Sequence, residues 1–258
     1  MPTHVAEILA ELDALLRPER YQDYCPNGLQ VPGPAEISTL VTGVSASAEL
    51  FQLAANERAG LLLVHHGLFW GAGPTQPIDH QLKRRLQLLF DADIALAAYH
   101  LPLDAHPTLG NNALIADALG AQRLDDPPFA HHRGEPIGCL ARFPGDGIPV
   151  TELVARVGSV TKRAPLVFDS GPAQIRTLAI VSGAGSDYLS DAASAGADAL
   201  LTGEPAERAM SQARELGLHY IAAGHYATET FGVRALGEHL AERFVGLRHV
   251  FLDVPNPV

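Results

Sequence analysis

Apolar residues occur along the chain in two kinds of block, which alternate. Some blocks are short continuous runs of Leu, Val, Ile and Ala, as in buried strands, and others repeat apolar residues every three or four positions, as in amphipathic helices. The predicted strands are 38–46, 60–64, 94–100, 176–183, 198–203 and 220–225, and the predicted helices are 1–16, 48–59, 80–92, 111–121, 188–196, 208–217 and 230–243. This alternation predicts an α/β protein with largely parallel strands.

The stretch between about residues 122 and 172 interrupts the alternation. It is richer in Pro, Gly and charged residues, and contains only the strand-like IGCLARF (137–143) and the helical TELVARVGSV (151–160). Beyond it the strand and helix blocks resume.

The second series of blocks resembles the first closely enough to indicate an internal duplication. A shift of 138 positions places TLVTGVSASAELFQLAANERAGLLLV (39–64) on TLAIVSGAGSDYLSDAASAGADALLT (177–202). A shift of 125 places LAAYHLPLD (96–104) on IAAGHYATE (221–229), so that His100 matches His225 and Asp104 matches Glu229. Two matches in the same order predict two pseudo-equivalent α/β halves, 1–125 and 126–258, within one compact unit.

Composition narrows the possible partners. The 258 residues carry 29 Asp and Glu against 18 Lys and Arg, a net charge of −11, so a broad electrostatic surface for nucleic acid or anionic membrane is not expected, although a local basic groove stays open. No apolar run approaches the roughly 20 residues of a membrane span, and the N-terminal segment predicts a docking helix and not a signal peptide. Cys25 and Cys139 form no C-x-x-C pair, which favours the reducing cytoplasm.

Metal-ligating residue types follow several of the predicted strands. His65 and His66 end one strand, Asp104 comes after another, and His225 and Glu229 follow a third. Ligands in parallel α/β folds bind beyond the carboxyl ends of strands. Imidazole nitrogens and carboxylate oxygens suit borderline divalent metals such as Zn, Mn, Fe, Co or Ni, and five side chains exceed the needs of one open tetrahedral site. The sequence therefore favours two ions that share a carboxylate.

Each of these residues also has a purely structural interpretation. Adjacent histidines on a strand point to opposite faces, so one of the pair can be a core imidazole and the other a surface residue. Asp104 can cap a turn, and Glu229 can be a helix-terminal carboxylate beside a satisfied His225. Glu204 can cap the helix that Pro205 would begin. Because these histidines and carboxylates occur together at strand ends, metal binding is favoured over the structural alternatives.

The motifs resemble those of the Nif-three-like family, which is also known as the type 2 form of GTP cyclohydrolase I or as dinuclear metal centre hexameric proteins. The segments that carry the resemblance are NGLQV (27–31), LLLVHHGLFWG (61–71), YHLPLDAHPTLGNNALIADALG (99–120), LLTGEPAE (200–207) and AAGHYATETFGV (222–233). Together they span nearly the whole chain, at the length of the short bacterial form. Leu101-Pro102 and Asn112 depart from the commoner family spelling, and neither departure changes a proposed ligand.

The resemblance implies a two-half α/β subunit in a toroidal homohexamer, with two divalent metals per subunit. Carried over by position, His66 and Asp104 would hold one metal, His65 and His225 the other, and Glu229 would bridge them. Glu204 and His100 match ligand positions of the other half without being assigned to a metal, so they are candidates for proton transfer or for orienting a ligand.

The expected chemistry is hydrolysis by a metal-activated water. The chain contains no G-x-x-x-x-G-K-[ST] motif, and neither Lys83 nor Lys162 lies beside a proposed ligand, so the sequence ranks a metal-dependent hydrolase with another small-molecule or nucleotide substrate above a GTP cyclohydrolase. Two alternatives stay open. One is a metal-binding or partner-binding module without turnover. The other is a ring that binds or processes nucleic acid, and the negative net charge disfavours this second alternative without excluding it.

Overall fold

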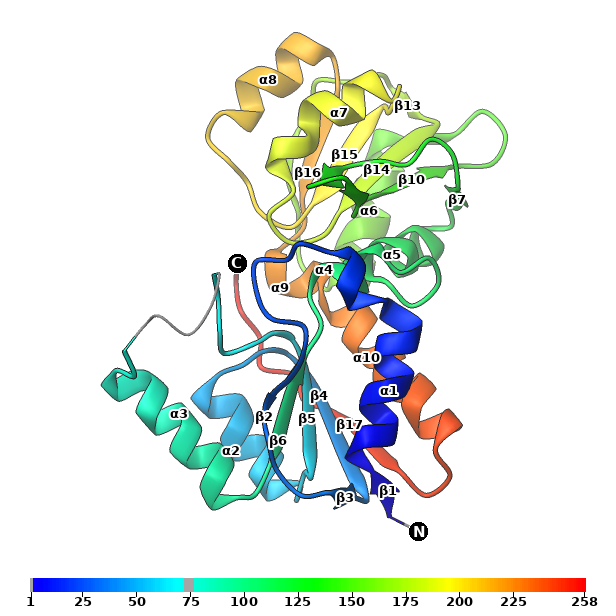
Figure 1. Ribbon diagram of the computed structural model, residues 1–258. Coiled ribbons are helices and arrows are strands. Elements are labelled where there is room, and N and C mark those ends of the chain that lie inside the picture. The colour runs from blue at the N-terminus through cyan, green and yellow to red at the C-terminus, as the bar shows by residue number, and fades with distance from the viewer. Residues whose placement is uncertain (1, 72–76) are drawn as a thin grey trace. The chain divides into compact units, whose positions relative to one another are not determined.

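The computed structural model describes residues 2–71 and 77–258, and the chain divides into two compact units (Figure 1). Unit 1 comprises Met1–Leu103 and Gly232–Val254, and unit 2 comprises Asp104–Phe231 and Pro255–Val258. Residues 104–125, assigned above to the first half of the repeat, thus belong to unit 2, where helix α5 (Asn111–Leu119) packs on its sheet. The long connection GLFWGAGPTQPID of the first half includes residues 72–76, which lie outside the described residues.

Unit 1 is built on a five-stranded sheet with the order β17-β4-β5-β6-β2. Its strands are β2 (Gly28–Val31), β4 (Thr39–Ser45), β5 (Leu61–His66), β6 (Ala95–Ala98) and β17 (Arg248–Phe251). The first four strands in this order are parallel, and β2 runs antiparallel to β6. A separate short ladder joins β1 (Thr3–His4) to β3 (Glu36–Ile37).

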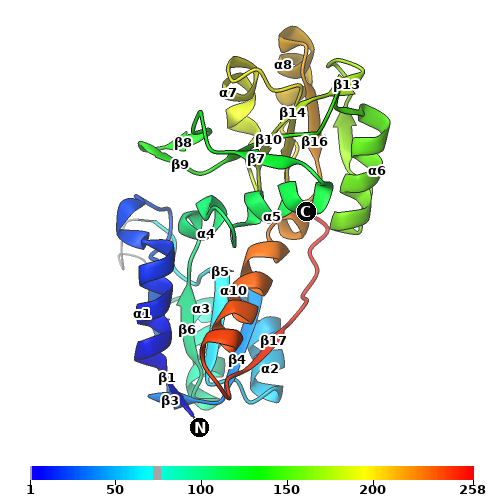
Figure 2. The same cartoon turned by 90° about the vertical axis from the view of Figure 1, so that its right-hand side faces the viewer.

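Helices cover both faces of this sheet (Figures 1 and 2). They are α1 (Val5–Leu16), α2 (Ala48–Asn56), α3 (His80–Asp91) and most of α10 (Thr230–Arg243), with the short turn η1 (Pro18–Arg20) after α1. The pictures place α2 and α3 on one face, and α1 with α10 on the other. The apolar stripe of α1 faces inward as its spacing predicts, since Ile8 and Leu12 are fully buried. Leu50 and Phe51 of α2 join Leu62 and Val64 of β5 in the core of this unit.

Unit 2 is built on a six-stranded mixed sheet with the order β12-β16-β15-β14-β10-β7. Its strands are β7 (Gln122–Leu124), β10 (Cys139–Arg142), β12 (Leu166–Phe168), β14 (Thr177–Val181), β15 (Ala199–Thr202) and β16 (His219–Ala222). Only β14, β15 and β16 are parallel to one another, and the other three strands pair antiparallel. The expectation of largely parallel strands therefore holds better for unit 1.

The middle segment of the sequence supplies the additional strands and a helix of unit 2. Within it β8 (His131–His132) pairs with β9 (Glu135–Pro136), and its strand β11 (Ile148–Pro149) pairs with β13 (Gln174–Ile175), which lies just beyond it. The helices of unit 2 are α5, α6 (Val150–Thr161), α7 (Leu189–Ser194), α8 (Ala209–Leu216) and α9 (His225–Thr228), with η2 (Ser186–Tyr188) before α7; α4 (Leu101–Ala105) lies at the boundary of the units. Leu153 and Val157 of α6 pack with Leu178 and Leu201 in the core.

The two sheets share a strand order that supports the internal duplication. In unit 1, β4, β5, β6 and β2 are neighbours in that order, and in unit 2 β14, β15, β16 and β12 follow the same order, with the last strand antiparallel in both. Even the register agrees, since Leu40 pairs with Leu61 and, 138 residues later, Leu178 pairs with Ala199. Strands β6 and β16 are equivalent at a shift of 124 residues. His225 lies one residue farther beyond β16 than His100 lies beyond β6, so the two histidines match at a shift of 125.

Among the described residues, every helix is too short or too polar to cross a membrane.

Candidate metal-binding residues

Three imidazoles gather at the carboxyl ends of β5 and β6 in unit 1. One ring nitrogen of each of His65, His66 and His100 lies within 4.8 Å of the other two, a grouping that can hold a metal ion. The ring centroids of His65 and His66 are only 4.8 Å apart, although they are neighbours in sequence. His65 is fully buried and His66 is half-buried, and their rings nevertheless lie beside each other at the end of β5.

Hydrogen bonds fix which nitrogen of two of these rings carries the proton. His65 Nδ1 lies 3.1 Å from the carbonyl oxygen of Tyr99, and His100 Nδ1 lies 2.7 Å from Asp23 Oδ1. A carbonyl or a carboxylate accepts, so Nδ1 is the donor in both rings, and the lone pair of the neutral imidazole is on Nε2. Histidine ligands of metals are held in this way. The third ring is bonded through His66 Nδ1 to Ser45 Oγ at 2.9 Å.

Asp23 is the residue of unit 1 that the sequence did not indicate. Besides His100 it accepts hydrogen bonds from the side chain of Asn27 and the backbone of Leu101. Burial would raise its pKa, but these hydrogen bonds and the charge of His100 outweigh burial and lower the pKa to about 2. Asp23 is therefore a carboxylate near neutral pH, and it orients His100. It lies in the loop QDYCPNG, 77 residues from its partner, so no local pattern could have found it.

In unit 2, His225 lies between two carboxylates. Its Nδ1 is 2.5 Å from Glu204 Oε1 and its Nε2 is 3.1 Å from Glu229 Oε1. Burial lowers the pKa of His225, but first Glu229 and then Glu204 outweigh it and raise the pKa to about 9. The His-x-x-x-Glu spacing thus brings its two side chains together, as expected for the helical turn α9. Glu204 is a hydrogen-bond partner of His225, which fits the orienting role more directly than the helix-cap interpretation.

Asp104 is held by a buried hydrogen-bond network in unit 2. Its Oδ1 accepts from Asn111 Nδ2 and from Ser182 Oγ, each at 2.8 Å. Asn112 continues the network, since its Nδ2 donates to the carbonyl of Ile137 and its Oδ1 accepts from the backbone of Ser182. Only 7% of Asp104 is exposed. A buried carboxylate with one oxygen fixed by two donors suits an oriented ligand better than a surface turn cap.

Gly183 completes the surroundings of His225 and Glu229. Its backbone is left-handed, with φ at +63°, and a Cβ at this position would lie 2.4 Å from Glu229 Oε1 and 3.1 Å from His225 Nε2. Its carbonyl also accepts from the backbone of Gly203 and of Glu204. A side chain cannot be accommodated here without moving the carboxylate. A glycine two residues after a buried strand was the signal in the sequence that could have indicated it.

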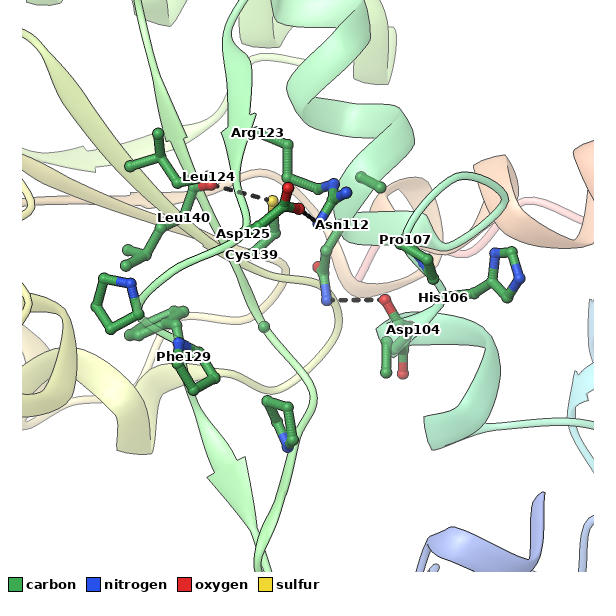
Figure 3. A pocket seen from close by; sticks show the side chains of 16 residues that line it. Asp104, His106, Pro107, Asn112, Arg123, Leu124, Asp125, Phe129, Cys139 and Leu140 are labelled. Carbon is green, nitrogen blue, oxygen red and sulfur yellow. Dashed lines mark hydrogen bonds and ion pairs between the residues drawn. The ribbon is translucent and has the colours of Figure 1, made fainter. Parts of the chain in front are cut away.

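A small cavity adjoins Asp104 in unit 2 (Figure 3). Its volume is about 120 Å³, and its walls include Asp104, Asn112, Cys139 and the ion pair that Arg123 forms with Asp125 at 2.7 Å. This volume holds several waters, and it is small for a nucleotide. Burial raises the pKa of the Cys139 thiol to about 12, so Cys139 is not an activated nucleophile.

The predicted site residues thus fall into two groups of donors, one in each unit. His65, His66 and His100 come together in unit 1; Glu204, His225 and Glu229 come together in unit 2, where a ligand atom of Asp104 also lies within 4.8 Å of one of Glu229. Each group offers nitrogen or oxygen ligands held by hydrogen bonds, so buried His, Asp and Glu side chains can hold a metal ion.

The matches to known proteins cover the whole chain. A family model described as Duf34/NIF3 (NGG1p interacting factor 3) matches residues 3–257. The chain belongs to the DUF34/NIF3 family. This result confirms the family that the sequence motifs indicated, and with it the α/β fold class.

Relatives within the DUF34/NIF3 family share close to half of their residues with this chain. It is 44% identical over 256 residues to the GTP cyclohydrolase 1 type 2 homolog of Vibrio cholerae, covering 98% of each chain. It is 41% identical over 262 residues to the protein of the same name from Pseudomonas aeruginosa, covering 100% of both.

Solved structures agree with the fold. TTHA1606 from Thermus thermophilus is 40% identical with a TM-score of 0.87, and the match covers 99% of this chain and 100% of that one. Protein ybgI, of unknown function, is 38% identical with a TM-score of 0.90 at the same coverage.

Proposed function

We propose that the protein is a metal-dependent hydrolase that holds two divalent ions with His65, His66, Asp104, His225 and Glu229. The observation that carries this proposal is the fixed orientation of the imidazoles. His65 and His100 donate Nδ1–H to a carbonyl and a carboxylate, and His225 has a carboxylate at Nδ1. A histidine in an ordinary protein core needs only one hydrogen bond. Three imidazole rings with one nitrogen each within 4.8 Å of the others are better explained as a group that binds a metal ion.

The donor chemistry supports Zn, Mn, Fe, Co or Ni over Mg or Ca. Imidazole nitrogens mixed with carboxylates suit borderline ions, whereas Mg and Ca prefer oxygen alone. When bound, such ions polarise the bond under attack and lower the pKa of a water. The carboxylate of Glu229, 2% exposed, is the candidate for sharing between two ions, because it has two oxygens and one of them already reaches His225.

His100 and Glu204 are proposed to handle protons and orientation. His100 has Asp23 at Nδ1, so its Nε2 can accept a proton while the carboxylate stabilises the resulting imidazolium. Glu204 holds His225 in place through Nδ1 and is partly exposed, which leaves it accessible to a leaving group. The name of the relatives makes GTP the first substrate to test.

The test is a screen with metal-loaded protein. Metal content is measured by elemental analysis, and then GTP, other nucleotides, phosphoesters and short oligonucleotides are offered to wild type, His65→Ala and Glu229→Ala, with His131→Ala as the control. His131 is exposed on β8 and is not one of the proposed ligands. We expect about two ions per chain and metal-dependent product formation, both lost in the first two variants and kept in the control.

Each other result contradicts a defined part of the proposal. If His65→Ala and Glu229→Ala bind as much metal as wild type, the proposed metal site is wrong. Bound metal without any product means a metal-binding module, and salt-sensitive oligonucleotide binding without product means a nucleic-acid protein.

We also propose the toroidal homohexamer that the family resemblance implies. Light scattering coupled to size exclusion measures the mass directly, and a monomer or dimer at micromolar concentration would contradict the assembly.

A further inference from the structure

The turn α9 (His225–Thr228) carries one proposed ligand at its start and is followed directly by another, Glu229. It is far shorter than the roughly 12 residues that an isolated helix needs to be even marginally stable. The first N–H groups of any helix also have no acceptor within the helix. The position of His225 and Glu229 therefore depends on groups outside α9.

Both ends of α9 are held by segments that are distant in the sequence. Near its carboxyl end, Thr228 Oγ1 accepts from the backbone N–H of Gly183 at 3.1 Å. Near its start, the backbone N–H of Tyr226 donates to the main-chain oxygen of Val258 at 3.0 Å. Val258 belongs to Pro255–Val258, here named the return segment, because the chain passes through most of α10 and β17 in unit 1 before it returns to unit 2.

Arg163 connects the return segment to the start of α9. Its Nη1 donates to the carbonyl of Pro257 at 2.7 Å. The same side chain packs on the backbone of Gly224, the residue before His225, so closely that a Cβ on Gly224 would lie 2.5 Å from Nη1. Gly224 has a φ of +99°, a conformation that suits glycine, and its missing side chain leaves room for the guanidinium. Arg163 thus contacts both α9's entry and the segment that caps it.

A local hydrogen bond shapes the return segment itself. The backbone N–H of Val258 donates to Asn256 Oδ1 at 3.0 Å. Asparagine side chains commonly form such a bond to the backbone two residues later, and it turns the chain. Asn256 and Arg163 therefore act on the same segment through different bonds.

We propose that Arg163 and the return segment position the donor group of unit 2, because they hold the turn that carries His225 and leads into Glu229. The inference rests on the proposed function in one respect, since it takes these two residues as metal ligands. Removing a group that orients a ligand lowers metal affinity about 10- to 100-fold. Arg163 and the return segment act on the ligands through the backbone of α9, so we expect losses at the lower end of this range.

Metal affinity of the full-length protein, measured by calorimetry, tests the effect on the ligands. Arg163→Ala should bind metal about 10-fold more weakly than wild type. Arg163→Lys should recover part of the loss, because an ammonium group can still donate to the carbonyl of Pro257. Asn256→Ala should also weaken metal binding, whereas Asn256→Asp should not, because a carboxylate oxygen still accepts from the N–H of Val258.

Arg176→Ala is the matched control. Arg176 Nε also donates to a main-chain carbonyl of unit 2, that of Asp146 at 3.4 Å, and neither residue is a proposed ligand. This variant should keep wild-type metal affinity. Equal losses in Arg176→Ala and Arg163→Ala would assign the effect to the removal of any such arginine and would contradict positioning by Arg163.

Hydrogen exchange of the metal-free protein tests the hold on α9 without any metal. Mass spectrometry of the peptide that contains Tyr226 should show lower protection in Arg163→Ala and Asn256→Ala than in wild type. The peptide that contains β14 should stay as protected as in wild type, because a general loss of stability would expose both peptides alike.

The two measurements separate this inference from the proposed function. Unchanged protection of α9 in Arg163→Ala and Asn256→Ala overturns the inference. Wild-type metal affinity in these two variants also overturns it when Glu229→Ala loses metal. Wild-type metal content in Glu229→Ala overturns the proposed function instead, and the protection of α9 then decides whether the return segment holds the turn.

Discussion

In unit 1 the strand β5 ends on two imidazoles, His65 and His66, whereas in unit 2 the equivalent strand β15 is followed by Gly203 and Glu204. The strands themselves are alike, since Leu61–Val64 and Ala199–Thr202 are all buried and keep the same register with the preceding strand. Side chains that pack on both faces of the sheet restrict which residues the interior of a strand can accept, whereas residues at a strand end are not restricted in this way. The duplicated halves therefore kept their sheets and diverged in the donors at the strand ends.

A second comparison shows what both units retained. His100 and His225 match in the repeat, and each has a carboxylate at Nδ1, Asp23 at 2.7 Å and Glu204 at 2.5 Å. The two carboxylates come from different places, Asp23 from the loop before β2 and Glu204 from the loop after β15. The same orientation of an imidazole has thus been reached with unrelated residues, which argues that the orientation matters to what these residues do.

The largest effect on the donors of unit 2 is expected from Gly183→Ala. The new Cβ would lie 2.4 Å from Glu229 Oε1, so the His225–Glu229 pair must separate, and we expect metal affinity, measured by calorimetry, to fall more than about 100-fold. Gly196→Ala is the matched control, because Gly196 also has a positive φ, +74°, with nothing within 4 Å of an added Cβ. Each variant should lose about 1 kcal/mol of unfolding free energy to left-handed strain. Equal metal affinity in the two variants would contradict the role of Gly183.

Asp23→Ala and Glu204→Ala compare the two orienting carboxylates directly. Each should lower metal affinity about 10- to 100-fold, the usual effect of removing a group that orients a ligand. Asp23→Asn and Glu204→Gln should lose less, since the amide oxygen still accepts from Nδ1. The exposed Glu49→Gln and Asp191→Asn serve as controls for loss of charge. A large loss in one unit with none in the other would show that only one imidazole needs its partner.

The sequence predicted the framework better than the contacts that tune it. The helix 230–243 and the helix starting at residue 80 appear as α10 and α3, because their apolar spacing is decided locally. The pairing of β17 was missed, since RHVF has half-exposed residues without clear alternation and finds β4 about 200 residues away. The histidines at strand ends were found from chain position, but Asp23 was not, because its importance arises only where folding brings it to His100.

A pH effect should distinguish the sheet of unit 1 from that of unit 2. His249 on β17 lies under Gly237 of α10 and bonds Thr42 Oγ1 through Nε2 at 2.8 Å, and burial lowers its pKa. Below the unfolded pKa of about 6.5, this histidine is protonated in the unfolded chain and still neutral in the folded protein. The free energy of unfolding therefore falls as the pH falls, by at most about 1.4 kcal/mol per pH unit, until the pH reaches the folded pKa.

Urea unfolding at pH 7.5 and 5.5 measures this loss. His225, whose pKa is raised to about 9, contributes a slope of the opposite sign that every variant keeps, so the loss is read as a difference between variants. His249→Gln should lose less stability than wild type between pH 7.5 and pH 5.5, and the exposed His131→Gln should behave as wild type. The protection factors of the amides against hydrogen exchange should fall at pH 5.5 in β4 and not in β14, because the ring bonds a residue of β4. An identical pH slope in wild type and His249→Gln would assign the effect to another group.

The smallest difference concerns how equivalent helices begin. Helix α2 has Ser47 as its N-cap, with Oγ accepting from the backbone of Leu50 at 3.2 Å, whereas α7, at the corresponding place in unit 2, starts after Tyr188 without a side-chain cap. Ser47→Ala should lower the free energy of unfolding by about 1 kcal/mol, and Ser47→Gly by only a few tenths, since glycine also suits this position. Thermal unfolding of both variants tests this order. Unchanged stability in Ser47→Ala would mean that the hydroxyl contributes nothing and that α2, like α7, is held by packing alone.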